Sequence, residues 1–162
     1  MNFFDYLWDN KESPEKLFVV GNNEQISFKE LYTQSLSVAN FLLDNYGSGK
    51  EILIFSKNSI FFIISYLATL KSNNICVPVD YSIESSNFKH IISVIEPVAI
   101  FCKNNDKNKL PEGFESKVID EETINRLDGY SSSLSNSVSI NDGNVAQIIF
   151  TSGSTGIPKG VM

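Results

Sequence analysis

The residues of this chain that could do chemistry are concentrated in one short segment, 151–160, with the sequence TSGSTGIPKG. It combines three glycines, four hydroxyl side chains and one lysine. Glycines let a backbone adopt positive φ angles and let a bulky anion approach the amides, and successive N–H groups in such a turn form a concave anion site. Every polar side chain here can donate to an anion, and none is a general base or a carboxylate ligand for a metal. The segment is therefore suited to holding a polyphosphate.

The composition of this segment also has two other interpretations. A glycine- and serine-rich stretch can be a flexible connector, which is what composition alone favours. The nucleotide-triphosphatase loop, G-x-x-x-x-G-K-[ST], is the second alternative, and Lys159 does lie six residues after Gly153. However, Pro158 stands where that motif needs glycine, and Gly160 stands where it needs a magnesium-binding hydroxyl. This match fails at two essential positions.

The segment follows an apolar run at residues 145–150, which predicts a buried strand leading directly into it. Ligand-binding loops of open α/β sheets lie at such strand ends, which argues against a simple connector. Before this strand the composition changes sharply, with six serines among residues 131–139. We expect a surface loop or tether there.

Apolar runs and helical periodicities alternate along the rest of the chain. Residues 52–55, 75–79, 98–102 and 117–119 read as strands, and helices are expected over 60–70, capped by Asn58, and over 88–95, closed by Pro97. Such alternation is typical of right-handed crossovers feeding a parallel sheet, so the predicted fold class is α/β with flanking helices.

The first fifty residues contain signals for where a hairpin and a helix begin and end. Residues 18–20 and 24–26 flank a glycine-containing turn and predict a small hairpin. Ser27 and Glu30 have capping-box spacing, so a helix should begin there and end near Gly47.

Length, composition and charge limit the class of protein. With 162 residues, 42% hydrophobic and 20% charged, the chain can form one ordinary globular core. A net charge of -6 argues against nucleic acid as a partner, because phosphate-backbone binding needs a clustered basic surface. The longest apolar stretch, 60–70, is shorter than the roughly 20 residues of a membrane span. We expect no membrane span and a cytoplasmic location.

Residues 150–161 resemble the phosphate-loop signature of the adenylate-forming superfamily, [YF]-T-S-G-[ST]-T-G-x-P-K-G-V, at every position. This superfamily includes acyl-CoA synthetases, luciferases and the adenylation domains of nonribosomal peptide synthetases. Two upstream segments are similar to family elements as well: residues 26–31 to T-Y-x-E-L, and residues 70–80 to L-K-A-G-x-x-Y-V-P-L-D. The departures, Ser72 and Asn73 for Ala-Gly and Cys76 for tyrosine, fall at packing positions.

The resemblance implies an ATP-dependent, AMP-forming ligase that activates an amino acid or acyl acid as an acyl-adenylate for a thiol of CoA or of a phosphopantetheinyl carrier protein. Its expected cofactors are ATP and Mg. Within this resemblance, residues 77–80 favour the branch that activates amino acids or loads carrier proteins. No catalytic residue or metal ligand is expected in this chain; the ATP-binding residues that the resemblance implies are Thr151, Ser152, Gly153, Ser154, Thr155, Gly156, Lys159 and Gly160.

Family members continue well beyond this point, into their adenine and carboxylate pockets and a mobile carboxy-terminal domain. The chain thus resembles the N-terminal part of the AMP-binding domain, with an α/β core over 1–129, a serine-rich loop over 130–144, and a strand with a phosphate-binding loop over 145–162. We expect it to be inactive alone and to bind ATP with millimolar affinity or not at all. The alternative is a noncatalytic α/β module with at most weak phosphate binding.

Several conspicuous residues have simpler interpretations. Cys76 and Cys102 lie in apolar runs without metal-ligand spacing and are expected to be small buried hydrophobes. His90 has no partner at triad or ligand spacing. Asp80 is expected to shape a turn. Trp8 and its apolar neighbours predict a docking helix.

Overall fold

The computed structural model describes residues 3–8, 15–19, 24–131, 143–152 and 158–162. In chain order the elements are α1 Phe3–Trp8, β1 Leu17–Val19, β2 Gln25–Ser27, α2 Phe28–Tyr46, β3 Glu51–Phe55, α3 Ile60–Lys71, β4 Ile75–Val79, α4 Ser85–Ile95, β5 Ala99–Cys102, β6 Val118–Ile119, α5 Glu121–Arg126, β7 Ile149–Ser152 and β8 Pro158–Val161. Two short 3₁₀ helices, Asn104–Lys109 and Glu115–Lys117, connect β5 to β6.

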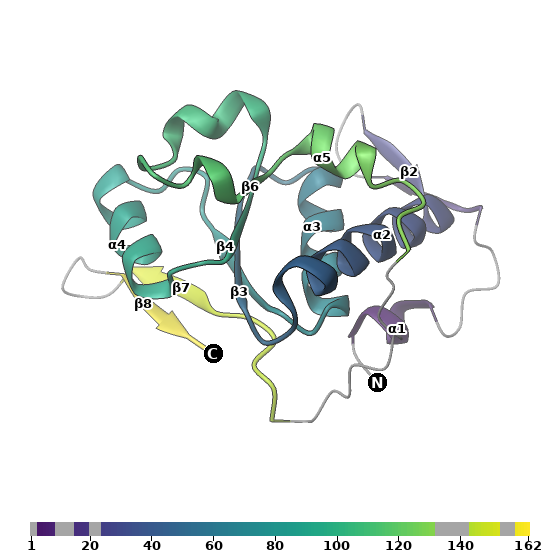
Figure 1. Cartoon of the computed structure of the whole chain (residues 1–162), viewed down its shortest axis with the longest axis horizontal. Coiled ribbons are helices and arrows are strands. Elements are labelled where there is room, and N and C mark those ends of the chain that lie inside the picture. The colour runs from purple at the N-terminus through teal and green to yellow at the C-terminus, as the bar shows by residue number, and fades with distance from the viewer. Residues whose placement is uncertain (1–2, 9–14, 20–23, 132–142, 153–157) are drawn as a thin grey trace.

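The centre of the molecule is a parallel sheet (Figure 1). Its strand order is β4-β3-β5-β6. Helix α3 connects β3 to β4, and α4 carries the chain back across β3 to β5. This alternation confirms the predicted α/β class.

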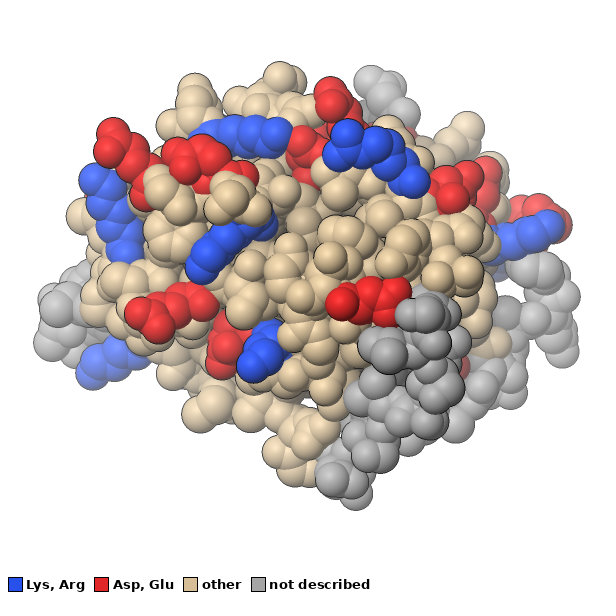
Figure 2. Space-filling model, viewed as in Figure 1, with Lys and Arg blue, Asp and Glu red and all other residues tan. Residues whose placement is uncertain are grey.

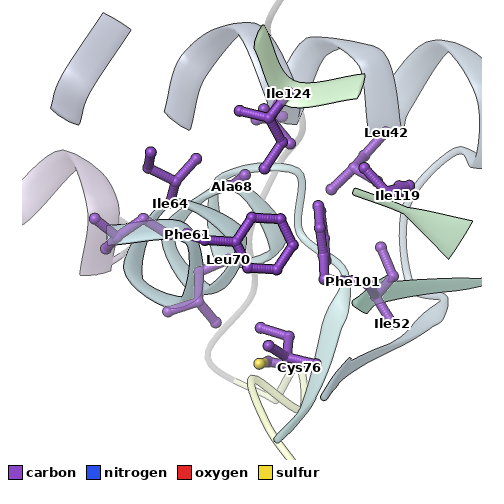
Figure 3. Close-up of a cluster of buried hydrophobic side chains, with 14 of the residues drawn as sticks. Leu42, Ile52, Phe61, Ile64, Ala68, Leu70, Cys76, Phe101, Ile119 and Ile124 are labelled. Carbon is purple, nitrogen blue, oxygen red and sulfur yellow. The ribbon is translucent and has the colours of Figure 1, made fainter. Parts of the chain in front are cut away.

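Side chains alternate between the two faces of a strand. The strands of this sheet therefore present apolar side chains on both faces, and helices cover both. Ile52 and Ile54 of β3 face the cluster formed with α2, α3 and α5, whereas Leu53 and Phe55 face the cluster formed with α4. Figure 3 shows the first cluster, in which the Phe61 and Phe101 rings meet edge to face with centroids 6.1 Å apart. The strands are buried on both faces, which explains their continuous apolar runs.

Capping residues set where the helices begin. At α2 the Ser27 hydroxyl accepts from the Glu30 N–H at 3.1 Å, and the Glu30 carboxylate accepts from the Ser27 N–H at 2.9 Å, so the predicted capping box is confirmed. At α3 the predicted cap was wrong by one residue. Ser59, not Asn58, accepts from the Phe62 N–H, at 3.2 Å.

The amino-terminal segments pack against α2 and α3. Strands β1 and β2 form the expected antiparallel pair; its turn, 20–23, lies outside the described residues. In α1, Phe4 is fully buried and the Trp8 indole N–H donates to the Phe28 carbonyl at 3.3 Å. This confirms α1 as a docking helix.

Charges of both signs are mixed on the face shown in Figure 2, rather than gathered into a basic tract. Among the described residues, no helix has the length and apolarity that crossing a bilayer requires.

Candidate functional site

The segment expected to bind phosphate forms an antiparallel hairpin of β7 and β8. Thr151 lies opposite Lys159, and Phe150 lies opposite Gly160. The strand expected at 145–150 is therefore shifted towards the loop, and β8 was not predicted. Residues 153–157, among them Gly153, Ser154, Thr155 and Gly156, lie outside the described residues, and of Ser152 only the backbone is described.

The two faces of this hairpin differ in character. Phe150 packs against the core cluster beneath α4, as does Ile148. The opposite face carries Thr151 and Lys159, both exposed. Since directly paired residues of an antiparallel ladder point to the same face, their hydroxyl and ammonium groups share one side. Within the described part of the chain, no carboxylate pairs with Lys159.

Gly160 lies in a tightly packed position. A Cβ atom at this position would lie 3.0 Å from Ile148 Cγ2 and 3.4 Å from Phe150 Cζ. Any larger residue would press on the two side chains that anchor the hairpin to the α4 cluster.

The hairpin joins the parallel sheet through Cys76 of β4. The Cys76 N–H donates to the Ala146 carbonyl at 3.0 Å, and the Ile148 N–H donates to the Cys76 carbonyl at 2.9 Å. The segment therefore extends the sheet beyond β4 by one bridge. Its burial was predicted wrongly, because Ile149 is 44% exposed. The segment lies at the sheet edge and β7 turns away to pair with β8.

A groove of about 470 Å³ lies between the hairpin and the carboxyl end of β4. Its walls include Phe150, Thr151 and Pro158 on one side and Asp80 and Glu84 on the other. Figure 1 shows the hairpin beside α4. Two carboxylates would repel phosphate, so the groove itself is a poor anion site. The exposed face with Lys159 is the better one.

Asp80 shapes the turn after β4, as predicted. Its carboxylate accepts from the Ser82 hydroxyl at 2.7 Å and from the Ser82 N–H at 2.8 Å. These bonds hold the pKa of Asp80 below its ordinary value, so the group is ionised at neutral pH.

A larger groove, about 770 Å³, lies on the other side of this turn, between α4 and the loop after β5. Tyr81 stacks on Phe55, with ring centroids 5.4 Å apart, and Lys109 Nζ lies 3.9 Å from the centre of the Tyr81 ring. Lys109 also pairs with Asp106 at 3.0 Å. No sequence motif marks this cluster, because its members come from separate segments.

The remaining candidates have structural roles. Cys76 and Cys102 are fully buried free thiols, and burial raises the pKa of each to about 12, so neither is a nucleophile at neutral pH. His90 is half-buried on α4. No group of three or more metal-ligating side chains occurs among the residues described.

Comparison with known proteins gives the family. The family model of AMP-binding enzymes matches residues 7–162. The chain belongs to the AMP-binding enzyme family. This membership agrees with the resemblance carried by residues 150–161.

As a member of this family, the chain is similar to ligases and synthetases. It is 31% identical over 153 residues to nonribosomal peptide synthetase 1 of Aspergillus fumigatus, covering 92% of this chain and 2% of that protein. It is 30% identical over 149 residues to the D-alanine–D-alanyl carrier protein ligase of Staphylococcus aureus, covering 92% of this chain and 29% of that enzyme.

Solved structures show the same fold. ATP-bound MatB from Rhodopseudomonas palustris superposes with a TM-score of 0.80 at 22% identity, over 100% of this chain and 35% of that one. The N-terminal subdomain of Klebsiella oxytoca NpsA gives 0.77 at 24% identity, over 98% of this chain and 38% of that one. The chain thus spans well under half the length of these proteins.

Proposed function

We propose that this chain is the N-terminal part of an ATP-dependent, AMP-forming ligase that activates a carboxylate as an acyl-adenylate. A carboxylate oxygen attacks the α-phosphorus of ATP, the bond to the bridging oxygen breaks, and pyrophosphate leaves. A thiol sulfur then attacks the acyl carbon and displaces AMP. The observation that carries the proposal is the hairpin: Thr151 and Lys159 share an exposed face, at the ends of a loop with the family's phosphate-binding sequence.

In this mechanism the chain holds the leaving group. The backbone amides and hydroxyls of residues 151–155, with Gly156 and Gly160 shaping the backbone, cradle the β- and γ-phosphates, and the Lys159 ammonium offsets the charge that develops on pyrophosphate. Adenylyl transfer depends mainly on such positioning and charge neutralisation. The described residues present no carboxylate cluster for Mg²⁺, so no step is assigned to a metal held by this chain.

We further propose an amino acid or a related acid as substrate and a carrier-protein thiol as acceptor, with CoA as the alternative. Support comes from the relatives, one a peptide synthetase and one a carrier protein ligase. The chain alone is proposed to be inactive, because it corresponds to 29% of the length of that carrier protein ligase.

The test is Lys159→Ala in the full-length enzyme, with the two half-reactions measured separately. ATP–pyrophosphate exchange with the cognate carboxylate should fall about 100-fold, as for loss of one charge-stabilising donor, and transfer from preformed adenylate to the thiol should change little. Lys50→Ala, which removes an exposed lysine before β3, is the matched control. Equal losses in the two half-reactions would contradict the assigned role.

A further inference from the structure

Among the described residues, a single backbone bridge, between Cys76 and Gln147, joins the hairpin segment to the parallel sheet. The neighbouring backbone groups of β4 explain why the pairing is so short. The next residue of β4 whose backbone faces the hairpin is two positions beyond Cys76, because backbone groups alternate sides along a strand. That residue is Pro78, which has no N–H to donate. In the other direction, the Asn74 N–H already donates to the Thr69 carbonyl at 3.0 Å. Pairing therefore stops after a single bridge.

Side chains supply the rest of the attachment. The Tyr66 hydroxyl, on α3, donates to Gln147 Oε1 at 3.0 Å. Gln147 is the residue bridged to Cys76, so this bond and the two backbone bonds converge on one point. Among the described residues, the other side-chain hydrogen bond to this segment joins Asn144 to Asn73 at 3.2 Å, and it is exposed.

Tyr66 is well placed to act as a fixed support. Its ring is half-buried and stacks on Phe62 with an interplanar angle of 12°. Burial, with a smaller effect of Cys76, raises the pKa of Tyr66, so the hydroxyl stays protonated and donating at neutral pH. Helix α3 in turn packs against α2 in the hydrophobic cluster that contains Ile52 and Ile54. The side chain thus connects the rigid core to the base of the hairpin.

We propose that Tyr66 and Gln147 are a positioning pair that fixes the phosphate-binding hairpin on the sheet edge. The role of the pair is to position the hairpin, not to bind phosphate. It sets the direction in which Ile148 and β7 leave β4, and with it the placement of Thr151 and Lys159. This inference rests on the proposed function and adds residues that lie outside the phosphate-loop signature.

The primary test is amide hydrogen exchange, followed by NMR, in Tyr66→Phe, in Gln147→Met and in the double variant. Each single change should accelerate exchange of the β7 and β8 amides about 3- to 10-fold, the effect of one hydrogen bond. The double variant should show no larger effect than either single change, since both remove the same bond. Exchange in β3 should stay unchanged.

Tyr46→Phe is the matched control, because it removes another half-buried hydroxyl, for which no hydrogen bond is found among the described residues. It should leave exchange in β7 and β8 unchanged. Unaltered exchange in Tyr66→Phe, or fully additive effects in the double variant, would overturn the positioning pair.

A second measurement separates this proposal from the function on which it rests. Titration with inorganic triphosphate should give an apparent Kd about 3- to 10-fold higher in Tyr66→Phe than in the unsubstituted chain. Equal affinity in the two chains would overturn the positioning role. If Lys159→Ala left ATP–pyrophosphate exchange by the full-length enzyme unchanged, the proposed function would fail, and hydrogen exchange would still decide whether the pair holds the hairpin.

Discussion

The role of each hairpin residue depends on the face of the hairpin on which it lies. Phe150 and Gly160 form the face that packs towards α4, and a Cβ atom at position 160 would crowd the side chains of Ile148 and Phe150. Thr151 and Lys159 form the exposed face. In the family signature Phe150 is next to Thr151 and Lys159 is next to Gly160, yet one residue of each pair has a packing role and the other has a group available to a ligand.

Gly160→Ala should destabilise the hairpin through crowding. The added methyl would lie 3.0 Å from Ile148 Cγ2, so Ile148 and Phe150 must shift. We expect a loss of about 1 kcal/mol in unfolding free energy, measured by urea denaturation. Gly143→Ala is the control, since a Cβ there meets nothing within 4 Å. Equal stability of the two variants would show that Gly160 is not under packing constraint.

At the scale of elements, local signals in the sequence predicted most of the structure. The central strands are continuous apolar runs, and the capping box at Ser27 marks its helix start to the residue. The cap of α3 was misassigned because Asn58 and Ser59 are both good caps, and the choice between them depends on backbone direction. Strand β8 was missed because Pro158 argues against a strand; at a sheet edge its missing N–H does no harm.

The features that could not be predicted depend on contacts between residues far apart in the sequence. Tyr66 and Gln147 are 81 positions apart, and neither lies in a recognisable motif. The hairpin's departure from the sheet follows from Pro78, which the sequence shows, but only the strand pairing reveals which side of β4 that proline faces. The division of the chain at residues 130 and 145 stays a prediction, since 132–142 lie outside the described residues.

Asp120 gives a prediction at the level of one element, α5. Its side chain caps the helix by accepting from the Thr123 N–H at 2.8 Å, and it pairs with Lys107 at 2.6 Å. Burial raises the pKa of Asp120, but hydrogen bonds from Lys107 and Thr123 outweigh it and lower the pKa to about 2.

Because the folded pKa lies below the ordinary value, this carboxylate stabilises the fold above about pH 4, and the contribution disappears as the pH falls through 2. Asp120→Asn should therefore lower the unfolding free energy by about 2 kcal/mol at neutral pH and by much less near the folded pKa. Urea denaturation across this range measures the difference. Glu122→Gln, exposed in the same turn, is the control. A constant difference at all pH values would contradict the assignment.

At the scale of the whole molecule, the features beside the hairpin gather at one end of the parallel sheet. The groove at β4, the larger groove beside Tyr81 and the hairpin all border the carboxyl ends of the strands, where open α/β sheets bind ligands. Exposed apolar side chains, Ile149 and Val161, lie on the hairpin face that also carries Lys159. The parallel sheet and the hydrophobic clusters on its two faces hold this edge in place.

The most direct test of the central claim, that the hairpin holds a triphosphate, is an NMR titration of this chain with inorganic triphosphate at millimolar concentrations. Amide shifts should concentrate at residues 149–152 and 158–161 and should be lost in Lys159→Ala but kept in Lys50→Ala. Shifts centred elsewhere, or an identical response of Lys159→Ala and the unsubstituted chain, would contradict the account.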